Sequence, residues 1–187
     1  MKYFLNSGGF ASREVNSYVK TIKSIATTSQ YDNIVKKLIS LFKNKSLDSA
    51  KFTLFYKEKV AISKSKPLTE KTPWGGVALK KVDVGKNYIR KLLVIKKHGV
   101  LGFEIHKLKH EKLKIVEGTC IVLYSSHSKP GWKPGKVSVK IASTGDKFEF
   151  LPNDEHGIIA LTNCVIEETS TNHLDDLVYI FKAEQAK

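Results

Sequence analysis

Four residues in the second half of the sequence have side chains that bind first-row divalent metals. Glu104 and His106 are two residues apart, so on a strand their side chains point to the same face. Glu111 follows the polar segment KLKH, which can return the chain as a neighbouring strand, and His156 begins a later apolar run. Nitrogen and oxygen ligands without thiolate suit Mn, Fe, Zn or Ni. The spacing therefore predicts a metal site made by Glu104, His106, Glu111 and His156, with the choice of metal open.

Each of these residues also has a purely structural interpretation. A lone histidine is more often a hydrogen-bonded core residue, and Glu104 fits an ordinary exposed strand position. However, Glu104 lies between the apolar residues Phe103 and Ile105, which indicates one apolar face and one Glu/His face. A buried acid is costly unless a cation or a partner neutralises it, and this favours a metal. We interpret His110 as a solvated turn residue instead.

The elements that would position these side chains are short strands. Beyond Trp74, runs rich in Val, Ile, Leu and Phe alternate with turn signals. About eight strands at this spacing indicate a sandwich or barrel rather than alternating β-α units, with Trp74 and Trp132 at its rims. The runs span residues 87–95, 102–106, 113–124, 137–142, 147–151, 156–161, 164–170 and 177–181.

The N-terminal third has a different pattern. Apolar residues at helical spacing predict helices over residues 11–26 and 29–45. Residues 51–62 are ambiguous between a strand and a third helix, and we favour the strand. The polar segment 63–73 contains two prolines and reads as a linker. We therefore expect a helical, Lys-rich extension over residues 1–66 and a β domain over residues 67–187.

Composition narrows the class of protein. The formal net charge is +14, and residues 1–66 hold 13 Lys or Arg against 4 Asp or Glu. Lysine predominates and aromatics are not interleaved with the charges, so we favour a solvated face over a nucleic-acid surface. No stretch reaches the roughly 18 apolar residues of a membrane span, and the start lacks a secretory pattern. Two distant cysteines, Cys120 and Cys164, fit a reducing cytoplasm.

The metal-site spacing resembles the cupin superfamily. Glu104, His106, Glu111 and Gly118 approximate its first motif, with Glu104 where a histidine usually stands. The second motif is approximated by four residues with altered spacing: Gly145, Pro152, His156 and Asn163. The sequence is most similar to small, single-barrel cupins of the mannose-6-phosphate isomerase-like type, over about residues 72–178. The matching positions are Trp74, Gly75, Lys91, Leu93, Ile95, His106, Glu111, Gly118 and the segment Glu168–Asp176.

This resemblance implies a fold and a function. The implied fold is mainly β: a cupin jelly-roll β-barrel, here with the N-terminal α-helical extension. The implied function is a metal-dependent, isomerase-like cupin that acts on a small polar ligand, a sugar phosphate or a related carbohydrate, and we expect the ligand to be anionic. Glu104 is then the candidate catalytic base where it does not bind metal. Lys91 either holds an anionic group of the ligand or pairs with a carboxylate.

Two departures from the family bear on that function. Glu104 replaces the usual glutamine of these small cupins, and Tyr179 stands where arginine is common. We favour an enzyme over two alternatives, which are a non-catalytic cupin module and an electrostatic nucleic-acid binder.

The outer side of the predicted barrel suggests a partner. If Glu104 and His106 face inward, Phe103 and Ile105 face outward, and an apolar outer face needs cover. The helical extension or a second subunit can supply it, so we expect a homodimer.

Two acidic residues near the end of the chain segment that resembles the cupins, Asp175 and Asp176, are interpreted as turn caps.

Overall fold

The computed structural model describes residues 49–69, 72–126, 130, 137–173 and 175–181. The helices predicted over residues 11–26 and 29–45, and Trp132, lie outside these residues. No helix in the described ranges combines the length and the apolar character needed to cross a membrane.

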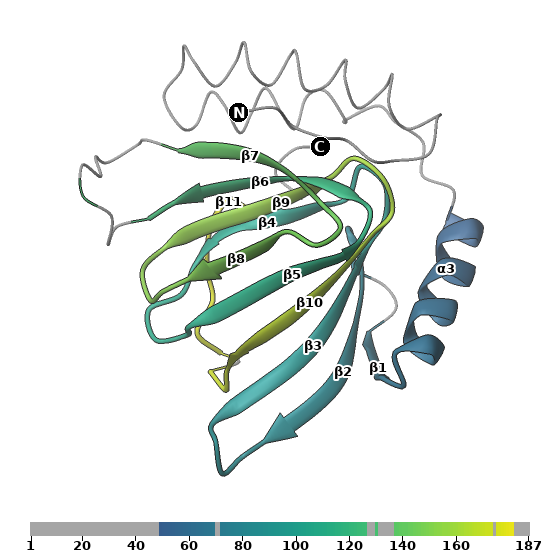
Figure 1. The fold of residues 1–187 in the computed structure, drawn as a ribbon, viewed down its shortest axis with the longest axis horizontal. Coiled ribbons are helices and arrows are strands. Elements are labelled where there is room, and N and C mark those ends of the chain that lie inside the picture. The colour runs from purple at the N-terminus through teal and green to yellow at the C-terminus, as the bar shows by residue number, and fades with distance from the viewer. Residues whose placement is uncertain (1–48, 70–71, 127–129, 131–136, 174, 182–187) are drawn as a thin grey trace.

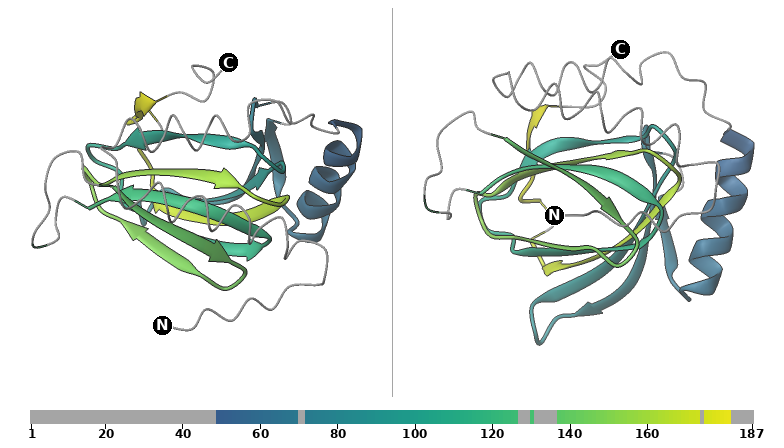
Figure 2. Two further views of the ribbon diagram at one scale, coloured as in Figure 1. Left: turned by 90° about the horizontal axis from the view of Figure 1, so that it is seen from above. Right: turned by 45° about the horizontal axis from the view of Figure 1, so that its top comes forward.

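The described strands form two antiparallel sheets that face each other around a shared interior (Figures 1 and 2). The larger sheet runs in the order β1 (Lys66–Thr69), β2 (Gly75–Asp83), β3 (Tyr88–Ile95), β10 (Cys164–Thr171), β5 (Glu111–Glu117) and β8 (Lys147–Phe150). The smaller sheet runs in the order β11 (Val178–Phe181), β4 (Val100–Ile105), β9 (Glu155–Ala160), β6 (Thr119–Ser125) and β7 (Ser138–Ser143). The predicted mainly β barrel is confirmed.

Each of the eight predicted runs contains a strand, and one of them contains two. The run over residues 113–124 splits into β5 and β6 at Gly118. This glycine has a φ of 92°, and a Cβ there would lie 2.3 Å from the carbonyl oxygen of Asn163, so only glycine allows the tight turn. Strands β1 and β2 were not among the predicted runs.

Alternating side chains place one face of each strand in the interior. In β5, Glu111, Leu113 and Ile115 are buried, whereas Lys112 and Lys114 between them are exposed. The same two-residue period on the other strands builds a closed apolar core at one end of the barrel. Its buried members are Leu93, Ile95, Leu113, Ile115, Cys120, Val122, Ala142, Phe150, Ile158, Ala160, Cys164 and Ile166.

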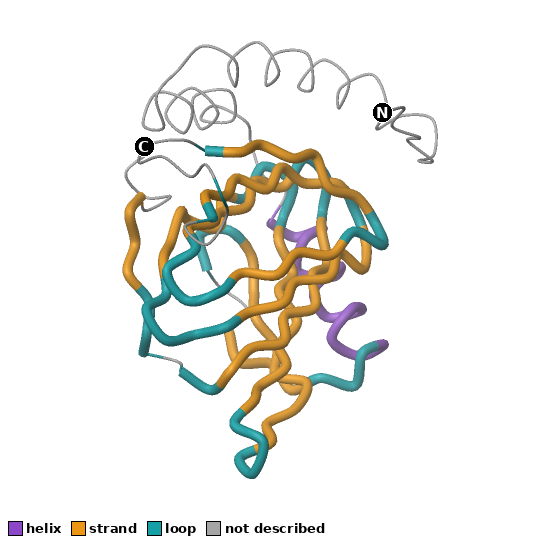
Figure 3. Tube along the Cα trace, turned by 60° about the vertical axis from the view of Figure 1, so that its left-hand side comes forward, coloured by secondary structure: helices purple, strands orange, loops and turns teal. Residues whose placement is uncertain are grey.

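The segment for which we favoured a strand is a helix, α3 (Ser49–Ile62), and that prediction is wrong. Aromatic and β-branched residues raise its strand propensity, but Phe52, Tyr56 and Val60 recur every four residues and form one buried stripe. The stripe packs on the outer face of the larger sheet, where the Tyr56 hydroxyl donates to the carbonyl oxygen of Val77 at 2.8 Å. Figure 3 shows the helix along the outside of the strands. Tertiary packing therefore overrides local propensity here.

Candidate metal centre

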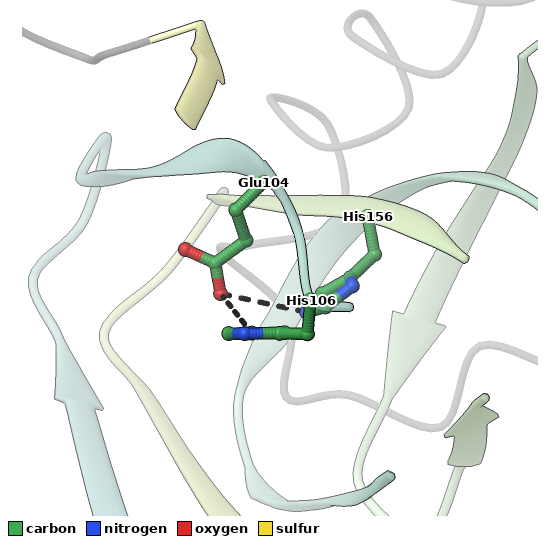
Figure 4. Close-up of side chains that lie close together, drawn as sticks. All are labelled: Glu104, His106 and His156. Atoms are coloured by element: carbon green, nitrogen blue, oxygen red, sulfur yellow. Dashed lines mark ion pairs between the residues drawn. The ribbon is translucent and has the colours of Figure 1, made fainter. Parts of the chain in front are cut away.

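The strands bring Glu104, His106 and His156 together in the interior. Glu104 on β4 lies opposite His156 on β9, and His106 directly follows β4. The Glu104 Oε1 atom lies 3.5 Å from the Nε2 atom of each histidine (Figure 4). One potential ligand atom from each residue lies within 4.8 Å of the other two, and all three residues are buried. These side chains meet although His106 and His156 lie 50 positions apart in the sequence.

A bulge in β4 makes this arrangement possible. The register between β4 and β9 shifts between Leu101 and Phe103, which places an extra residue on β4. As a result Leu101 packs against the apolar core while Glu104, three residues later, also faces the interior. Without the bulge, strict alternation would place these two side chains on opposite faces.

The fourth predicted ligand, Glu111, lies beside this triad at the start of β5. Its Oε1 atom is 3.0 Å from His156 Nε2, and its Oε2 atom is 3.9 Å from His106 Nε2. Glu111 is 3% exposed, so its charge has little access to water. The structure therefore places all four predicted residues near one another, while the candidate metal cluster among the described residues consists of Glu104, His106 and His156, with Glu111 beside His156.

The polar atoms of the cluster fit a divalent metal. The Nε2 atoms of His106 and His156 are buried and make no hydrogen bond within the described part of the chain, because the short contacts to carboxylates are poorly directed. Two imidazole nitrogens and carboxylate oxygens are donors that Mn, Fe, Zn and Ni accept. Buried nitrogens without a hydrogen bond are costly, and a bound cation would satisfy them.

Electrostatic interactions among the histidines and carboxylates of the cluster shift their pKa values. Burial alone would raise the pKa of Glu104, but His106 and His156 lower it to about 2. Burial would lower the pKa of His156, but Glu111 and Glu104 raise it to about 10. The pKa of Glu111 lies well below its usual range because His156 and Lys109 outweigh its burial. Without metal, a protonated His156 therefore balances part of the carboxylate charge, and a bound cation would take over that role.

A chain of buried ion pairs leads away from Glu111. Lys109 pairs with both Glu111 and Glu168, and its Nζ lies 2.8 Å from Glu168 Oε1. Lys91 Nζ lies 2.9 Å from the same Glu168 oxygen, which also accepts a hydrogen bond from Ser170 at 3.0 Å. Although burial opposes it, the two carboxylates raise the pKa of Lys109 above its usual value. Positive and negative groups thus alternate from Lys91 to the candidate metal centre.

Lys91 and His110 occupy the positions that the sequence suggested. Lys91 faces inward, and of the two roles left open for it the structure shows the pairing with a carboxylate, Glu168. His110 is partly exposed in the loop before β5, and its Nε2 lies 2.8 Å from Glu149 Oε1. It belongs to no candidate metal cluster among the described residues.

The sequence analysis missed Lys109 and Glu168 as interior charges. Lys109 was placed in a polar turn, and only the fold shows that its side chain enters the barrel. Glu168 carried a usable signal, because it shares strand parity with the apolar residues Cys164 and Ile166. That parity predicts an inward side chain for all three.

Aromatic rings line the other side of His156. The Phe150 ring stacks on the imidazole of His156, with centroids 4.2 Å apart and planes 5° apart. Phe148 and Tyr124 lie next to Phe150, with centroid separations of 6.2 Å and 6.5 Å. The Nδ1 atom of His156 has no hydrogen-bond partner within the described residues. Stacking on Phe150 therefore fixes the orientation of the His156 ring.

Comparison with known proteins establishes the fold. No family model and no curated protein matches the sequence. Peruvianin-I, a cysteine peptidase from Thevetia peruviana latex, matches with a TM-score of 0.50 and 16% identity over 63% of this chain and 74% of its own. Oxalate decarboxylase from Bacillus subtilis, in a structure that addresses its Mn(II) centres, matches with a TM-score of 0.50 and 17% identity over 63% of this chain and 31% of its own. CapF in complex with 3-isopropenyl-tropolone matches with a TM-score of 0.50 and 16% identity over 62% of this chain and 34% of its own.

These likenesses show the predicted cupin jelly-roll barrel. The matched part of this chain spans about a third of the length of oxalate decarboxylase and of CapF. At such low identity the comparisons concern the fold, and the isomerase-like subtype is not represented by these three proteins.

Proposed function

We propose that this protein is a metal-dependent cupin that acts on a small polar ligand, a sugar phosphate or a related carbohydrate. The observation that carries the proposal is the buried convergence of Glu104, His106 and His156, in which the Nε2 atoms of the two histidines find no hydrogen-bond partner among the residues that the structure describes. The residues that would hold the metal are these three together with Glu111. Mn, Fe, Zn and Ni all suit this donor set.

The chain's own residues support a proton transfer. A bound divalent metal would polarise a carbonyl or hydroxyl oxygen of the ligand. Glu104 is ionised over the physiological pH range because its pKa is about 2, so its carboxylate can accept a proton where it does not bind metal. Moving a proton between adjacent carbons is the step that aldose–ketose isomerisation requires.

Lys91 has a defined role in this proposal. Its ammonium group lies at the far end of the ion-pair chain, and its side chain is 15% exposed. An anionic group of the ligand would interact with Lys91 in competition with Glu168. We therefore keep Lys91 as the candidate residue for ligand charge and Glu104 as the candidate base.

Isotope exchange tests the proposed reaction directly. Metal-free protein is loaded with Mn²⁺ or Zn²⁺ and incubated in D₂O with a panel of aldose and ketose phosphates and the unphosphorylated sugars. Proton NMR should show deuterium entering the carbon next to the carbonyl of at least one compound. Glu104→Gln should lose this exchange, while Glu149→Gln, an exposed control, should keep it. Absence of exchange for the whole panel would contradict the isomerase-like reaction.

A non-catalytic cupin module is the second candidate. Lys91 and Lys109, the two interior lysines described above, already pair with carboxylates, so neither is poised as a free base. This function predicts that ligands from the same panel bind the metal-loaded protein without any isotope exchange. Calorimetric titration beside the NMR measurement separates the two candidates.

We also infer a cytoplasmic homodimer. The two cysteines are buried and free, as in proteins of reducing compartments. The proposed dimer gains less support: Phe103, expected on the outer face, is 1% exposed and Ile105 is partly buried. Light scattering at micromolar concentration tests the dimer, and a monomeric mass would contradict it.

A further inference from the structure

Asp176 contacts four consecutive residues next to the candidate metal centre. It lies in the segment between β10 and β11. Its Oδ1 atom accepts a hydrogen bond from the backbone N–H of Lys107 at 3.1 Å, and its Oδ2 atom accepts from Leu108 at 2.5 Å and Lys109 at 2.9 Å. Its main-chain carbonyl oxygen contacts the Nδ1 atom of His106. The expected turn cap is therefore a contact between two segments about 70 residues apart.

The contact with His106 fixes the state of its imidazole. A carbonyl oxygen only accepts hydrogen bonds, so the Nδ1 atom of His106 must carry the proton and donate it. A histidine that binds a metal is neutral, and with the proton on Nδ1 its lone pair resides on Nε2, the atom that faces Glu104 and has no hydrogen-bond partner among the described residues. Such outer contacts orient histidine ligands and set their tautomer in metal sites.

The hydrogen bonds from the backbone of residues 107–109 to the Asp176 carboxylate also position Lys109. Lys109 follows the two other residues that donate to the carboxylate, and its side chain pairs with Glu111 and Glu168. Holding the backbone of residues 107–109 therefore also holds the start of the ion-pair chain. The three backbone donors lower the pKa of Asp176 against the opposing effect of its burial, so the carboxylate is ionised at neutral pH.

We propose that Asp176 is a positioning residue of the metal centre. Its carboxylate fixes the loop over residues 107–109, and its carbonyl group presents the Nε2 lone pair of His106 to the metal. The same loop places the side chain of Lys109 next to Glu111. The inference rests on the proposed metal function only for the effect on metal affinity, because the tautomer of His106 is a property of the metal-free protein.

The test compares Asp176→Ala and Asp176→Asn with Asp175→Ala in the full-length protein. Asp175 is the exposed neighbour and serves as the matched control. Nitrogen-15 NMR of the imidazole groups should show His106 protonated at Nδ1 in the wild type. Asp176→Ala keeps the main-chain carbonyl group but removes the carboxylate that anchors it to residues 107–109, so His106 should show a mixture of tautomers in this variant. Amide hydrogen exchange at residues 107–109 should become faster in the same variant. Asp176→Asn keeps one oxygen acceptor, so its changes should be intermediate.

Metal affinity supplies the second readout. Titration with Mn²⁺ or Zn²⁺ should show an affinity about 10-fold weaker in Asp176→Ala, where the carbonyl group that contacts His106 remains but is no longer anchored, and unchanged in Asp175→Ala. The melting temperature of the asparagine variant shows whether global unfolding causes these changes. If Asp176→Ala does not fold, the asparagine variant carries the comparison.

The outcomes separate this inference from the proposed function. Unchanged tautomer and amide exchange in the Asp176 variants would overturn the positioning role, even if metal binds. A change in both with no metal binding by the wild type would support the positioning role and refute the metal proposal. Equal effects of the Asp175 and Asp176 variants would also overturn it.

Discussion

The two halves of the barrel interior are built from the same strands but have opposite chemistry. On β5, Leu113 and Ile115 belong to the apolar core, whereas Glu111 one step earlier on the same face belongs to the metal centre. On β9, Ile158 is apolar and His156 is a candidate ligand. On β10, Ile166 gives way to Glu168. On these three strands the interior side chains therefore change from apolar to charged or metal-binding along the strand.

The apolar half of the interior contributes mainly to stability, whereas the charged half contributes the candidate functional groups. The apolar half gains free energy from burial and needs no partner groups. The charged half costs free energy unless each charge is compensated, and its compensation is local: Lys91 and Lys109 for Glu168, and the two histidines for Glu104. A fold selected for stability alone would not require this second half. We therefore expect substitutions in the two halves to affect different measurements.

Removing a charge from the charged half should have the largest effect on stability. Lys109→Met leaves Glu111 and Glu168 without their shared partner in a buried site, which should cost about 3–5 kcal/mol in the free energy of unfolding. Urea unfolding of the metal-free protein measures this. Lys107→Met, at an exposed position nearby, should stay within about 0.5 kcal/mol of the wild type. Equal stabilities for the two variants would refute the buried ion-pair chain.

Truncation in the apolar half should reduce stability and spare the metal. Ile158 is fully buried, so Ile158→Ala should cost about 2–5 kcal/mol through lost burial and the cavity that remains. Metal affinity should stay within about twofold of the wild type. Leu54→Ala, on the exposed side of α3, is the control and should be nearly neutral. A large loss of metal affinity in Ile158→Ala would erase the distinction between the halves.

The charged half should also set the pH dependence of stability. Because the pKa of His156 is raised to about 10, its contribution is complete below pH 6.5 and is lost as the pH rises through 10. Because the pKa of Glu104 is lowered to about 2, its contribution is complete above pH 4.5 and is lost as the pH falls through 2. Metal-free protein should therefore be most stable between about pH 4.5 and 6.5.

Urea unfolding at a series of pH values measures this profile, with a slope of at most about 1.4 kcal/mol per pH unit for one proton. Ile158→Ala should lower the whole curve without changing its shape. In His156→Gln the decline above pH 6.5 should disappear. A wild-type curve that rises from pH 6.5 to 9 would contradict the coupling.

The smallest expected effect lies outside the barrel, where α3 packs. Tyr56→Phe removes the hydrogen bond to the carbonyl oxygen of Val77 but keeps the ring, so stability should fall by about 1 kcal/mol. Thermal unfolding measures the change. Neither the pH profile nor the metal affinity should respond, and a response of either would connect α3 to the interior.

Strand parity explains how much of the site the sequence could predict. Alternation alone places Glu111 and His156 inward together with Leu113 and Ile158. It also places Lys91 inward, as the structure shows. The resemblance in spacing to cupins then predicts the barrel that brings these distant strands together.

The remaining features depend on tertiary structure. Gly102, the extra residue of the β4 bulge, is a glycine inside a strand and therefore a signal for a bulge, but the sequence does not show that this bulge lets Leu101 and Glu104 share the interior. Lys109 lies in a loop, where no periodicity defines the direction of its side chain. The helix α3 forms because its stripe packs on the outer face of the barrel, a surface that does not exist in the isolated segment.

Metal analysis of the purified protein tests the central claim most directly. Elemental analysis and calorimetric titration should find one first-row divalent metal per chain in the wild type and in His110→Ala. In His106→Ala and His156→Ala the affinity should fall at least about 100-fold while the barrel still folds. Metal bound with wild-type affinity after either of these two substitutions would contradict the account.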